Sequence, residues 1–252
     1  MARTIVLTRP APHIGEGLSG FSVLHLPTLQ VTAHVDSIFE AHLRAQWPRY
    51  DGVMLVSQYA AHFACERLHD LNLSWPTTMW AAVVGQGSFD AVHQYLPHIE
   101  CLKPMANDTQ DSEGLWRTLQ PRINASSRVL IVRAQTGRDV FAQHLIDQGA
   151  SVDVWPCYQR SVQVWTAGQK TSFRVALTQG LVIVMASTEG LHALLANLSE
   201  LTEAERSLTL QQPVLTHHDS IAQKAHALGF SRVRVAAMAH NEQALIELAS
   251  SD

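Results

Sequence analysis

Two serines end apolar, strand-like runs and stand at the start of helical patterns. Ser57 follows the run from Val53 to Val56, and Ser187 follows the run from Leu181 to Ala186. A serine at a strand-to-helix turn is a good N-cap, and the backbone N–H groups behind it attract anions. Two such turns in one chain predict two similar α/β halves that grip one polyanion between them.

Other anion-binding side chains stand at or near the ends of predicted strands. Open α/β sheets bind ligands beyond the carboxyl ends of their strands, which makes these positions the first candidates. They are Arg9, Ser57, Ser88, Arg133, Ser187 and Ser220. Any one serine is explained by an ordinary N-cap, whereas the whole set indicates a binding surface. Arg138, at a predicted helix start, either binds a carboxylate or phosphate in bidentate fashion or pairs with Asp139.

Tyr158 is the candidate for proton chemistry, because it stands where a predicted domain meets a predicted linker. A phenol at this position could reach a cleft and act as a general acid. The alternative is a hinge tyrosine that is anchored by its hydroxyl. The sequence leaves both interpretations open.

Metal and nucleotide chemistry are disfavoured. The 14 histidines form no H-E-x-x-H motif and no Cys/His cluster with ligand spacing, and the densest group, His217-His218-Asp219, is better explained as a solvated turn. The turn Gly85-Gln86-Gly87-Ser88 lacks the third glycine of a dinucleotide motif, and no P-loop occurs. The separated cysteines Cys65, Cys101 and Cys157 fit neither a disulfide framework nor a zinc knot. We therefore expect no metal and no cofactor.

Strand and helix patterns alternate along the chain, which predicts parallel sheets with helices on both faces. Predicted strands cover residues 5–7, 23–26, 53–57, 80–84, 129–132, 152–155, 181–187, 213–216 and 233–236. Predicted helices cover residues 35–47, 59–68, 89–96, 111–119, 137–149, 190–198, 220–228 and 241–249, after a weak first helix that bears glycines. The expected fold class is α/β, with two doubly wound parallel-sheet domains of the flavodoxin or Rossmann-like type.

Two extended segments, residues 28–32 and 161–164, are predicted to be linker strands. They set the expected domain organisation. Residues 1–28 and 165–252 form one discontinuous α/β domain, and residues 35–156 form a second α/β domain inserted into the first. Residues 29–34 and 157–164 form a two-stranded β-ladder that joins the two domains.

Composition limits the partners that this chain can have. The formal charge of −4 and the lack of a basic block disfavour nucleic acid, while arginines focused in a cleft could still bind an acidic small molecule. The first apolar stretch is too short for a signal peptide, and no apolar run approaches membrane-spanning length. We therefore expect a cytoplasmic protein with no membrane partner. Without heptads or a long apolar stripe, we expect a monomer.

Taken together, these segments resemble the uroporphyrinogen-III synthase family. The resemblance runs in order through Val6 to Pro10, Asp51 to Val53 with Ser57, Val84-Gly85 with Ser88, Asp111 to Leu115, Val129 to Arg133 with Gly137-Arg138, Gly149 to Val152 with Tyr158 to Arg160, and Ala222 to Gly229 with Val233 to Ala236. Each motif is weak by itself, but their order and spacing across nearly the whole chain are fairly specific. Where the family often shows Phe-Thr-Ser, this chain has Leu55-Val56-Ser57.

The resemblance implies a cytoplasmic, cofactor-free enzyme of tetrapyrrole and haem biosynthesis. Its substrate would be hydroxymethylbilane, a linear tetrapyrrole with acetate and propionate groups on every ring, and its product uroporphyrinogen III, with the terminal ring inverted. Tyr158 matches the family's tyrosine that is proposed to assist loss of the hydroxyl. The matching substrate-binding positions are Arg9, Ser57, Ser88, Arg138, Ser187 and Ser220. Whether the chain works alone or in contact with the enzyme that makes its unstable substrate stays open.

Two other functions fit the same architecture. A non-catalytic two-domain binding module could close on an acidic small molecule. An α/β transferase could bind a nucleotide-sugar between its domains. The lack of an export signal disfavours a periplasmic binding protein, and no phosphate-binding loop supports the transferase.

Overall fold

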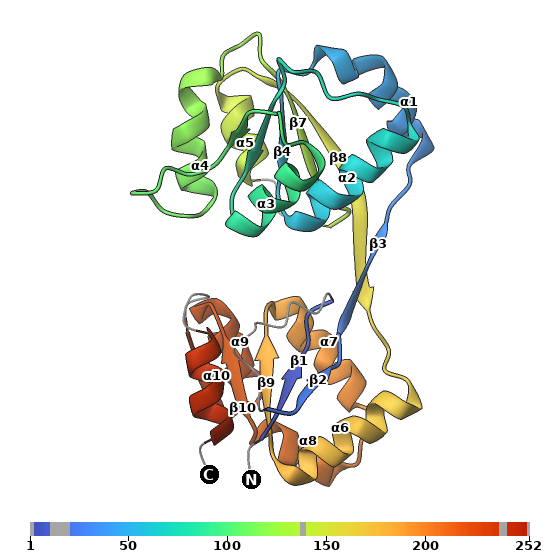
Figure 1. The fold of residues 1–252 in the computed structure, drawn as a ribbon, viewed down its shortest axis with the longest axis vertical. Coiled ribbons are helices and arrows are strands. Elements are labelled where there is room, and N and C mark those ends of the chain that lie inside the picture. The colour runs from blue at the N-terminus through green and yellow to red at the C-terminus, as the bar shows by residue number, and fades with distance from the viewer. Residues whose placement is uncertain (1–2, 11–20, 137–139, 237–240, 251–252) are drawn as a thin grey trace. The chain divides into compact units, whose positions relative to one another are not determined.

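A computed structural model describes residues 3–10, 21–136, 140–236 and 241–250. The chain divides into two compact units, which Figure 1 shows as ribbons. The terminal unit combines residues 1–30 with 161–252, and the central unit consists of residues 31–160. Both units are α/β structures built on a largely parallel sheet, which confirms the predicted fold class.

Within the described residues, the sheet of the central unit has six strands in the order β3-β8-β7-β4-β5-β6. They are β3 (Leu29–Ala33), β4 (Gly52–Leu55), β5 (Trp80–Val83), β6 (Cys101–Leu102), β7 (Arg128–Ala134) and β8 (Ser151–Val162). The pairs from β8 through β6 are parallel. The chain proceeds from β4 to β5 on one side and returns to β7 on the other, so the strand order reverses beside β4.

Helices cover both faces of this sheet (Figure 1). One face is covered by α1 (Ser37–Gln46), α2 (Gln58–Asp70) and α3 (Gln86–Tyr95), and the other by α4 (Ser112–Leu119) and α5 (Val140–Asp147). Short 3-10 turns, η2 (Trp47–Arg49) and η3 (Gln120–Arg122), follow α1 and α4. Val53 and Leu55 pack into the first core and Met54 into the second, because successive side chains of a strand point to opposite faces.

The described strands of the terminal unit form a parallel sheet in the order β11-β10-β9-β1-β2. They are β1 (Thr4–Leu7), β2 (Val23–His25), β9 (Leu181–Met185), β10 (Pro213–Thr216) and β11 (Arg232–Val235). The helices are α6 (Ala167–Gln179), α7 (Thr188–Leu198), α8 (Glu203–Leu210), α9 (Asp219–Ala227) and α10 (Asn241–Ser250). The strand order of this sheet reverses between β1 and β9, since the chain continues from β1 to β2 on one side and from β9 to β10 on the other.

Core residues of α6, α7 and α9 pack on one face of the terminal sheet, and those of α10 pack on the other. No helix in the described part of either unit is both long enough and apolar enough to cross a membrane.

The two predicted linker segments lie in β3 and in the second half of β8, where Figure 1 shows the two strands side by side. The His34 N–H donates to the Cys157 carbonyl at 2.9 Å and the Gln163 N–H to the Thr28 carbonyl at 2.8 Å, so the two strands are antiparallel. The sequence pattern predicts two separate strands at 152–155 and 161–164, whereas β8 is one continuous strand of 12 residues. A register shift opposite Arg133 and Ala134 lets β8 continue past Pro156.

Besides the 3-10 turn η3, three further elements fall outside the sequence prediction: α6, α8 and β6. The two helices begin with capping boxes, in which Thr166 and Gln169, and likewise Thr202 and Glu205, satisfy each other's backbone N–H groups. These T-x-x-Q and T-x-x-E patterns were a readable signal for a helix start. By contrast, β6 has only two residues and carries no strand periodicity.

Candidate functional site

Ser57 lies where the strand order of the central sheet reverses. It follows β4 and N-caps α2, and its Oγ accepts a hydrogen bond from the Ala60 N–H at 3.1 Å. Neighbouring strand-to-helix loops diverge at such a reversal and leave a crevice above the strand ends, which is where open α/β sheets bind ligands. The structure therefore puts Ser57 at the favoured ligand position of this unit.

Tyr158 reaches the same place from β8. Its hydroxyl lies 2.9 Å from Ser57 Oγ, and either oxygen can be the donor. Tyr158 as a whole is 3% exposed, and its ring stacks on Phe63 of α2, with ring centroids 6.0 Å apart and planes inclined by 17°. Tyr59 packs against it at 6.1 Å. Packing and the serine contact together fix the phenol at the carboxyl edge of the sheet.

Two hydroxyls in contact form a pair that can transfer a proton. Ser57 Oγ already accepts from a backbone N–H, and each hydroxyl both donates and accepts. A proton that leaves Tyr158 for a substrate can therefore be accompanied by a hydrogen bond from Ser57 to the phenol oxygen. This arrangement suits weak general-acid chemistry.

Ser88 lies inside the first turn of α3 and does not cap the helix. The N-cap is Gly85, which offers no side-chain hydrogen bond, and the Ser88 N–H donates to the Gly85 carbonyl at 3.1 Å. The half-buried Ser88 stands three residues beyond Gly85, after the carboxyl end of β5. It is thus near the edge that holds Ser57, in the first turn of the helix that follows the neighbouring strand.

In the terminal unit, Arg9 and Ser187 follow the two strands between which the order reverses. Ser187 N-caps α7, and its Oγ accepts from the Gly190 N–H at 3.0 Å. Arg9 stands two residues beyond the end of β1 and is half-buried. His25 Nε2 lies 2.8 Å from the Arg9 carbonyl and fixes the backbone there. This edge therefore carries a cation and a hydroxyl at its switch point.

Ser220 lies in the first turn of α9, after the next strand of the terminal unit, β10. The N-cap of α9 is His218, whose Nδ1 accepts from the Ser220 N–H at 3.1 Å and lies 2.8 Å from the Ser220 hydroxyl. Beside it, burial lowers the pKa of His217 below its usual value, and the neighbouring His218 and Arg9 lower it further. His217 therefore favours its neutral form.

The structure brings Ser57 and Tyr158 into direct contact in the central unit. It places Ser88 in the first turn of α3. In the terminal unit it places Arg9 and Ser187 on strand-end loops and Ser220 in the first turn of α9. Arg138 lies outside the described residues. Arg133, near the end of β7, is half-buried.

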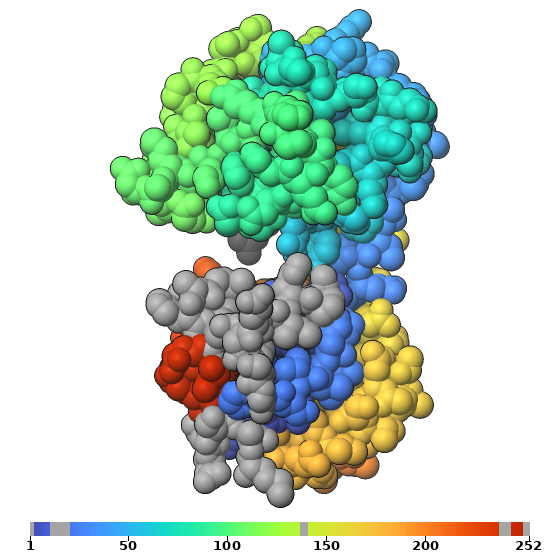
Figure 2. All heavy atoms as spheres, viewed as in Figure 1, coloured from blue at the N-terminus to red at the C-terminus, as the bar shows by residue number. Residues whose placement is uncertain are grey.

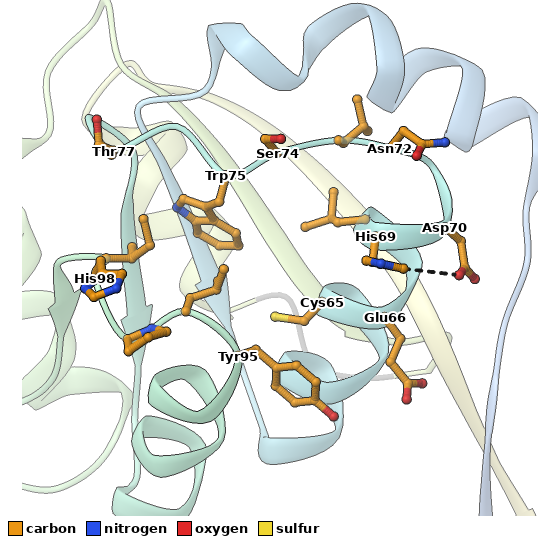
Figure 3. A pocket seen from close by; sticks show the side chains of 15 residues that line it. Cys65, Glu66, His69, Asp70, Asn72, Ser74, Trp75, Thr77, Tyr95 and His98 are labelled. Carbon is orange, nitrogen blue, oxygen red and sulfur yellow. Dashed lines mark ion pairs between the residues drawn. The ribbon is translucent and has the colours of Figure 1, made fainter.

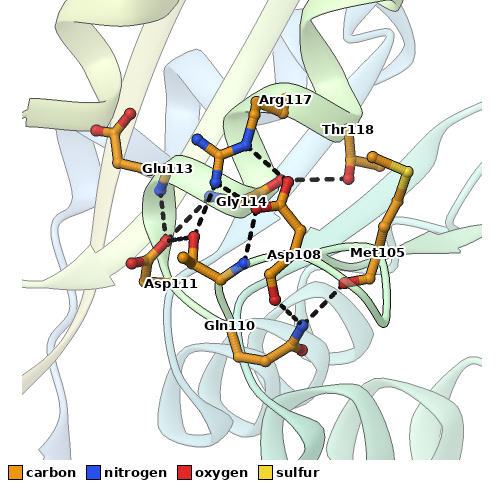
Figure 4. Close-up of polar contacts among 9 residues, drawn as sticks. Met105, Asp108, Gln110, Asp111, Glu113, Gly114, Arg117 and Thr118 are labelled. Carbon is orange, nitrogen blue, oxygen red and sulfur yellow. Dashed lines mark hydrogen bonds and ion pairs between the residues drawn. The ribbon is translucent and has the colours of Figure 1, made fainter.

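The loop from β6 to α4 lies at the same carboxyl edge as Ser57 and Ser88, and side-chain hydrogen bonds hold it (Figure 4). Arg117 Nε donates to Asp108 Oδ2 at 2.6 Å, and a second nitrogen of Arg117 also pairs with Asp108. This contact, with the Thr109 N–H, lowers the pKa of Asp108 to about 2. Asp111 caps α4 by accepting from the N–H groups of Glu113 and Gly114, each at 3.0 Å.

Lys103 begins this loop and is a residue that sequence reasoning missed. Its Nζ donates to Gln86 Oε1 at 3.2 Å and lies 4.5 Å from the ring centre of Phe89, so it stands beside the first turn of α3. The signal was a lysine directly after a strand and before a proline. This signal cannot be recognised from the sequence alone, because the two-residue strand β6 is not predicted.

A cavity of about 1110 Å³ lies in the central unit, away from these residues (Figure 3). Its lining comes from the end of α2, the segment leading into β5 and the segment between α3 and β6, including Cys65, Asp70, Trp75, Tyr95 and His98. These segments precede β5 and β6, so the cavity is at the amino end of the strands. It is therefore distinct from the edge that carries Ser57 and Tyr158.

The thiols show no sign of activation. Burial raises the pKa of Cys65 and of Cys157 to about 12, and that of Cys101 to about 11. All three side chains stay protonated near neutral pH, and none is in a disulfide. Among the residues that the structure describes, no group of three or more His, Cys, Asp or Glu side chains could hold a metal ion.

Sequence comparisons point to one family. A family model described as "Uroporphyrinogen-III synthase HemD" matches residues 17–247. The uroporphyrinogen-III synthase of Proteus mirabilis is 32% identical over 164 residues, which cover 62% of this chain and 80% of that protein. That of Escherichia coli strain K12 is 26% identical over 247 residues, which cover 96% of this chain and 98% of that protein.

Solved structures show the same fold. The uroporphyrinogen-III synthetase of Helicobacter pylori 26695 matches with a TM-score of 0.63, and a mutant uroporphyrinogen III synthase of Thermus thermophilus with 0.57. Each is 13% identical in sequence, and each alignment covers 98% of both chains. At 13% sequence identity, these matches show a shared fold only.

Proposed function

This chain belongs to the uroporphyrinogen-III synthase family, and from this premise we propose that it cyclises hydroxymethylbilane to uroporphyrinogen III in tetrapyrrole and haem biosynthesis. The family match over residues 17–247 is the observation that carries the proposal. The sequence resemblance and the family match both indicate this enzyme class. The names of the relatives give the product, so the steps of the reaction are proposed from the chemistry of the substrate and from the contacts of this chain's residues.

The reaction is a dehydration and ring closure that reverses one pyrrole. The C–O bond of the hydroxymethyl group breaks, and the hydroxyl takes a proton and leaves as water. The resulting azafulvene carbon bonds to the substituted carbon of the last ring and gives a spiro intermediate. The bond between the substituted carbon of the last ring and its original methylene carbon then breaks, and that methylene carbon bonds to the unsubstituted carbon of the same ring. Loss of the proton from this carbon restores the pyrrole with the last ring inverted and balances the proton given to the departing hydroxyl. Closure without inversion is the uncatalysed outcome and gives the type I isomer, so the main task of the protein is to orient the substrate.

In this proposal Tyr158 gives the proton to the departing hydroxyl. Its position beside Ser57 supports the role, because the serine hydroxyl can donate to the phenol oxygen as negative charge develops there. The ring contacts with Phe63 and Tyr59 restrict the phenol to one orientation. The reaction consists only of proton transfers and of bonds at carbon that break and form, so the proposal includes no cofactor and no metal.

The substrate carries carboxylates on every ring, and the strand-end loops of both units offer groups that bind them. We assign this role to Arg9, Ser187 and Ser220 in the terminal unit and to Ser57 and Ser88 in the central unit. Hydroxyls and helix N-termini at these loops support the assignment, since both interact favourably with anions. Arg138 is included on its sequence position alone.

Incubation of the purified protein with freshly made hydroxymethylbilane tests the function. The product is oxidised to porphyrin, and the type I and type III isomers are separated chromatographically. The proposal requires faster closure than in buffer and mainly type III product. A non-catalytic binding module or a nucleotide-sugar transferase would leave only the spontaneous type I isomer.

The same proposal describes a monomeric enzyme of the cytoplasm. Light scattering coupled to gel filtration tests the oligomeric state, and the expected result is the mass of a single 252-residue chain. Contact with the enzyme that makes hydroxymethylbilane is tested by adding that enzyme in the same experiment. A shared elution peak supports contact, and separate peaks support a synthase that works alone.

A further inference from the structure

Lys103 stands at the carboxyl end of the last strand of the central sheet. β6 pairs in parallel with β5, with Cys101 opposite Ala81 and Leu102 opposite Ala82. The residue after β6 therefore reaches the edge from which the Gly85 turn and α3 continue. Lys103 is exposed, and the next residue, Pro104, is buried, which anchors the backbone. Atoms of this part of the chain, green in Figure 2, lie on the viewed surface of the central unit.

The ammonium group is held by two uncharged partners. Nζ donates to Gln86 Oε1 at 3.2 Å and lies 4.5 Å from the ring centre of Phe89, whose negative face attracts a cation. The Gln86 side chain is itself oriented, because its Nε2 donates to Asp90 Oδ1 at 2.7 Å and leaves its oxygen for the lysine. These contacts limit where the lysine can point without neutralising its charge.

Five other cations of the described residues are each held by a carboxylate. Arg67 pairs with Glu40, Arg117 with Asp108, Arg122 with Glu100, Lys170 with Glu200 and Arg174 with Glu205. None of the ion pairs found among the described residues involves Lys103, whose contacts are with Gln86 and Phe89. A lysine that is oriented, exposed and without a carboxylate partner is ready to bind an anion from solution.

We propose that Lys103 binds a carboxylate of the linear tetrapyrrole and so helps to set the position of the substrate on the central unit. This inference rests on the proposed function and adds a residue that the sequence motifs do not include. Gln86 and Phe89 are the positioning residues of this contact. Lys103 itself takes no part in proton transfer, so its loss should raise KM and leave kcat nearly unchanged.

The test compares three variants with the unaltered protein in the hydroxymethylbilane assay. Lys103→Gln removes the charge, and Lys103→Arg keeps it. Arg49→Gln is the matched control, because Arg49 is an exposed cation of the same unit that precedes β4 and so lies at the opposite end of the strands. Circular dichroism and thermal melting check that each variant is folded.

Lys103→Gln should raise KM about two- to fivefold, the effect expected for one exposed charge pair. It should also weaken the increase of KM with added salt. Lys103→Arg should restore most of the affinity, and Arg49→Gln should match the unaltered protein. A Lys103→Gln variant with unchanged KM and unchanged salt dependence overturns the assignment, as does an equal effect of Arg49→Gln. If the unaltered protein itself yields no type III isomer, the proposed function fails, and not the lysine contact alone.

Discussion

Tyr158 combines a buried ring with a hydroxyl that meets another hydroxyl, and the two interpretations left open by the sequence make different predictions for its removal. If the phenol is the general acid, Tyr158→Phe should lower kcat about 100-fold, because proton transfer by a positioned side chain typically contributes at least that much. Activity should remain above the buffer rate, since orientation of the substrate is kept. Steady-state rates with hydroxymethylbilane decide the matter.

Tyr50 provides the matched control. It is also a buried tyrosine of the central unit, and its hydroxyl donates to Asp153 Oδ2 at 2.6 Å. Tyr50→Phe should cost about 1–2 kcal/mol of unfolding free energy and leave kcat unchanged. Equal losses of stability with no loss of kcat in both variants would make Tyr158 a structural anchor only.

His217 should make the stability of the protein depend on pH. Burial, His218 and Arg9 lower its pKa in the folded state, so the unfolded chain binds more protons just below pH ~6.5. The stabilising effect is complete above that pH and is lost as the pH falls through the folded-state pKa. Urea unfolding at pH 7.5 and 5.5 should show a larger loss for the unaltered protein than for His217→Asn. Identical pH dependence of both proteins would contradict this account.

At the scale of single elements, the position of α4 is constrained by the loop that precedes it. Gly114 is in the first turn of α4, where a Cβ would lie 1.9 Å from the Thr109 carbonyl oxygen. Helix propensity alone predicts that Gly114→Ala stabilises the protein by up to about 1 kcal/mol. We expect the opposite, a loss of about 1–3 kcal/mol, because the clash is with backbone and the loop is held by Arg117 and Asp108.

Gly168 in the first turn of α6 is the control for this substitution. The nearest atom to a Cβ there is Thr166 Oγ1 at 4.0 Å, so Gly168→Ala meets no obstacle. Its unfolding midpoint in urea should rise slightly or stay the same. If Gly114→Ala also raises the midpoint, the loop before α4 adapts and does not constrain the helix.

Elements with apolar periodicity could be predicted from the sequence. The apolar runs of β4 and β9 are buried on both faces, and each is followed by a serine that caps the next helix. Apolar character and the cap residue therefore both indicate where the strand ends and the helix begins. The predicted break in β8 is absent because pairing with β7 and β3 continues past Pro156, which a local pattern cannot reveal. Equally, β6 forms only because β5 provides a neighbour for its two residues.

At the scale of the whole molecule, the sequence located strand-end residues but not their contacts. Ser57 and Tyr158 are 101 positions apart in the sequence, and their contact depends on the pairing of β4 with β7 and on the register of β8 against β7. In the same way, the position of Lys103 depends on the pairing of β6, and its hydrogen bond depends on Gln86 of α3. By contrast, the reversal of strand order beside β4 and between β1 and β9 follows from ordinary α/β connection rules.

We propose that residues after the strands of each unit contribute to binding of hydroxymethylbilane. The most direct measurement is KM for hydroxymethylbilane in Arg9→Gln, altered in the terminal unit, and in Lys103→Gln, altered in the central unit. Our account predicts that each variant stays folded, raises KM about two- to fivefold and still yields mainly the type III isomer. A KM that responds to the substitution in only one unit would contradict it.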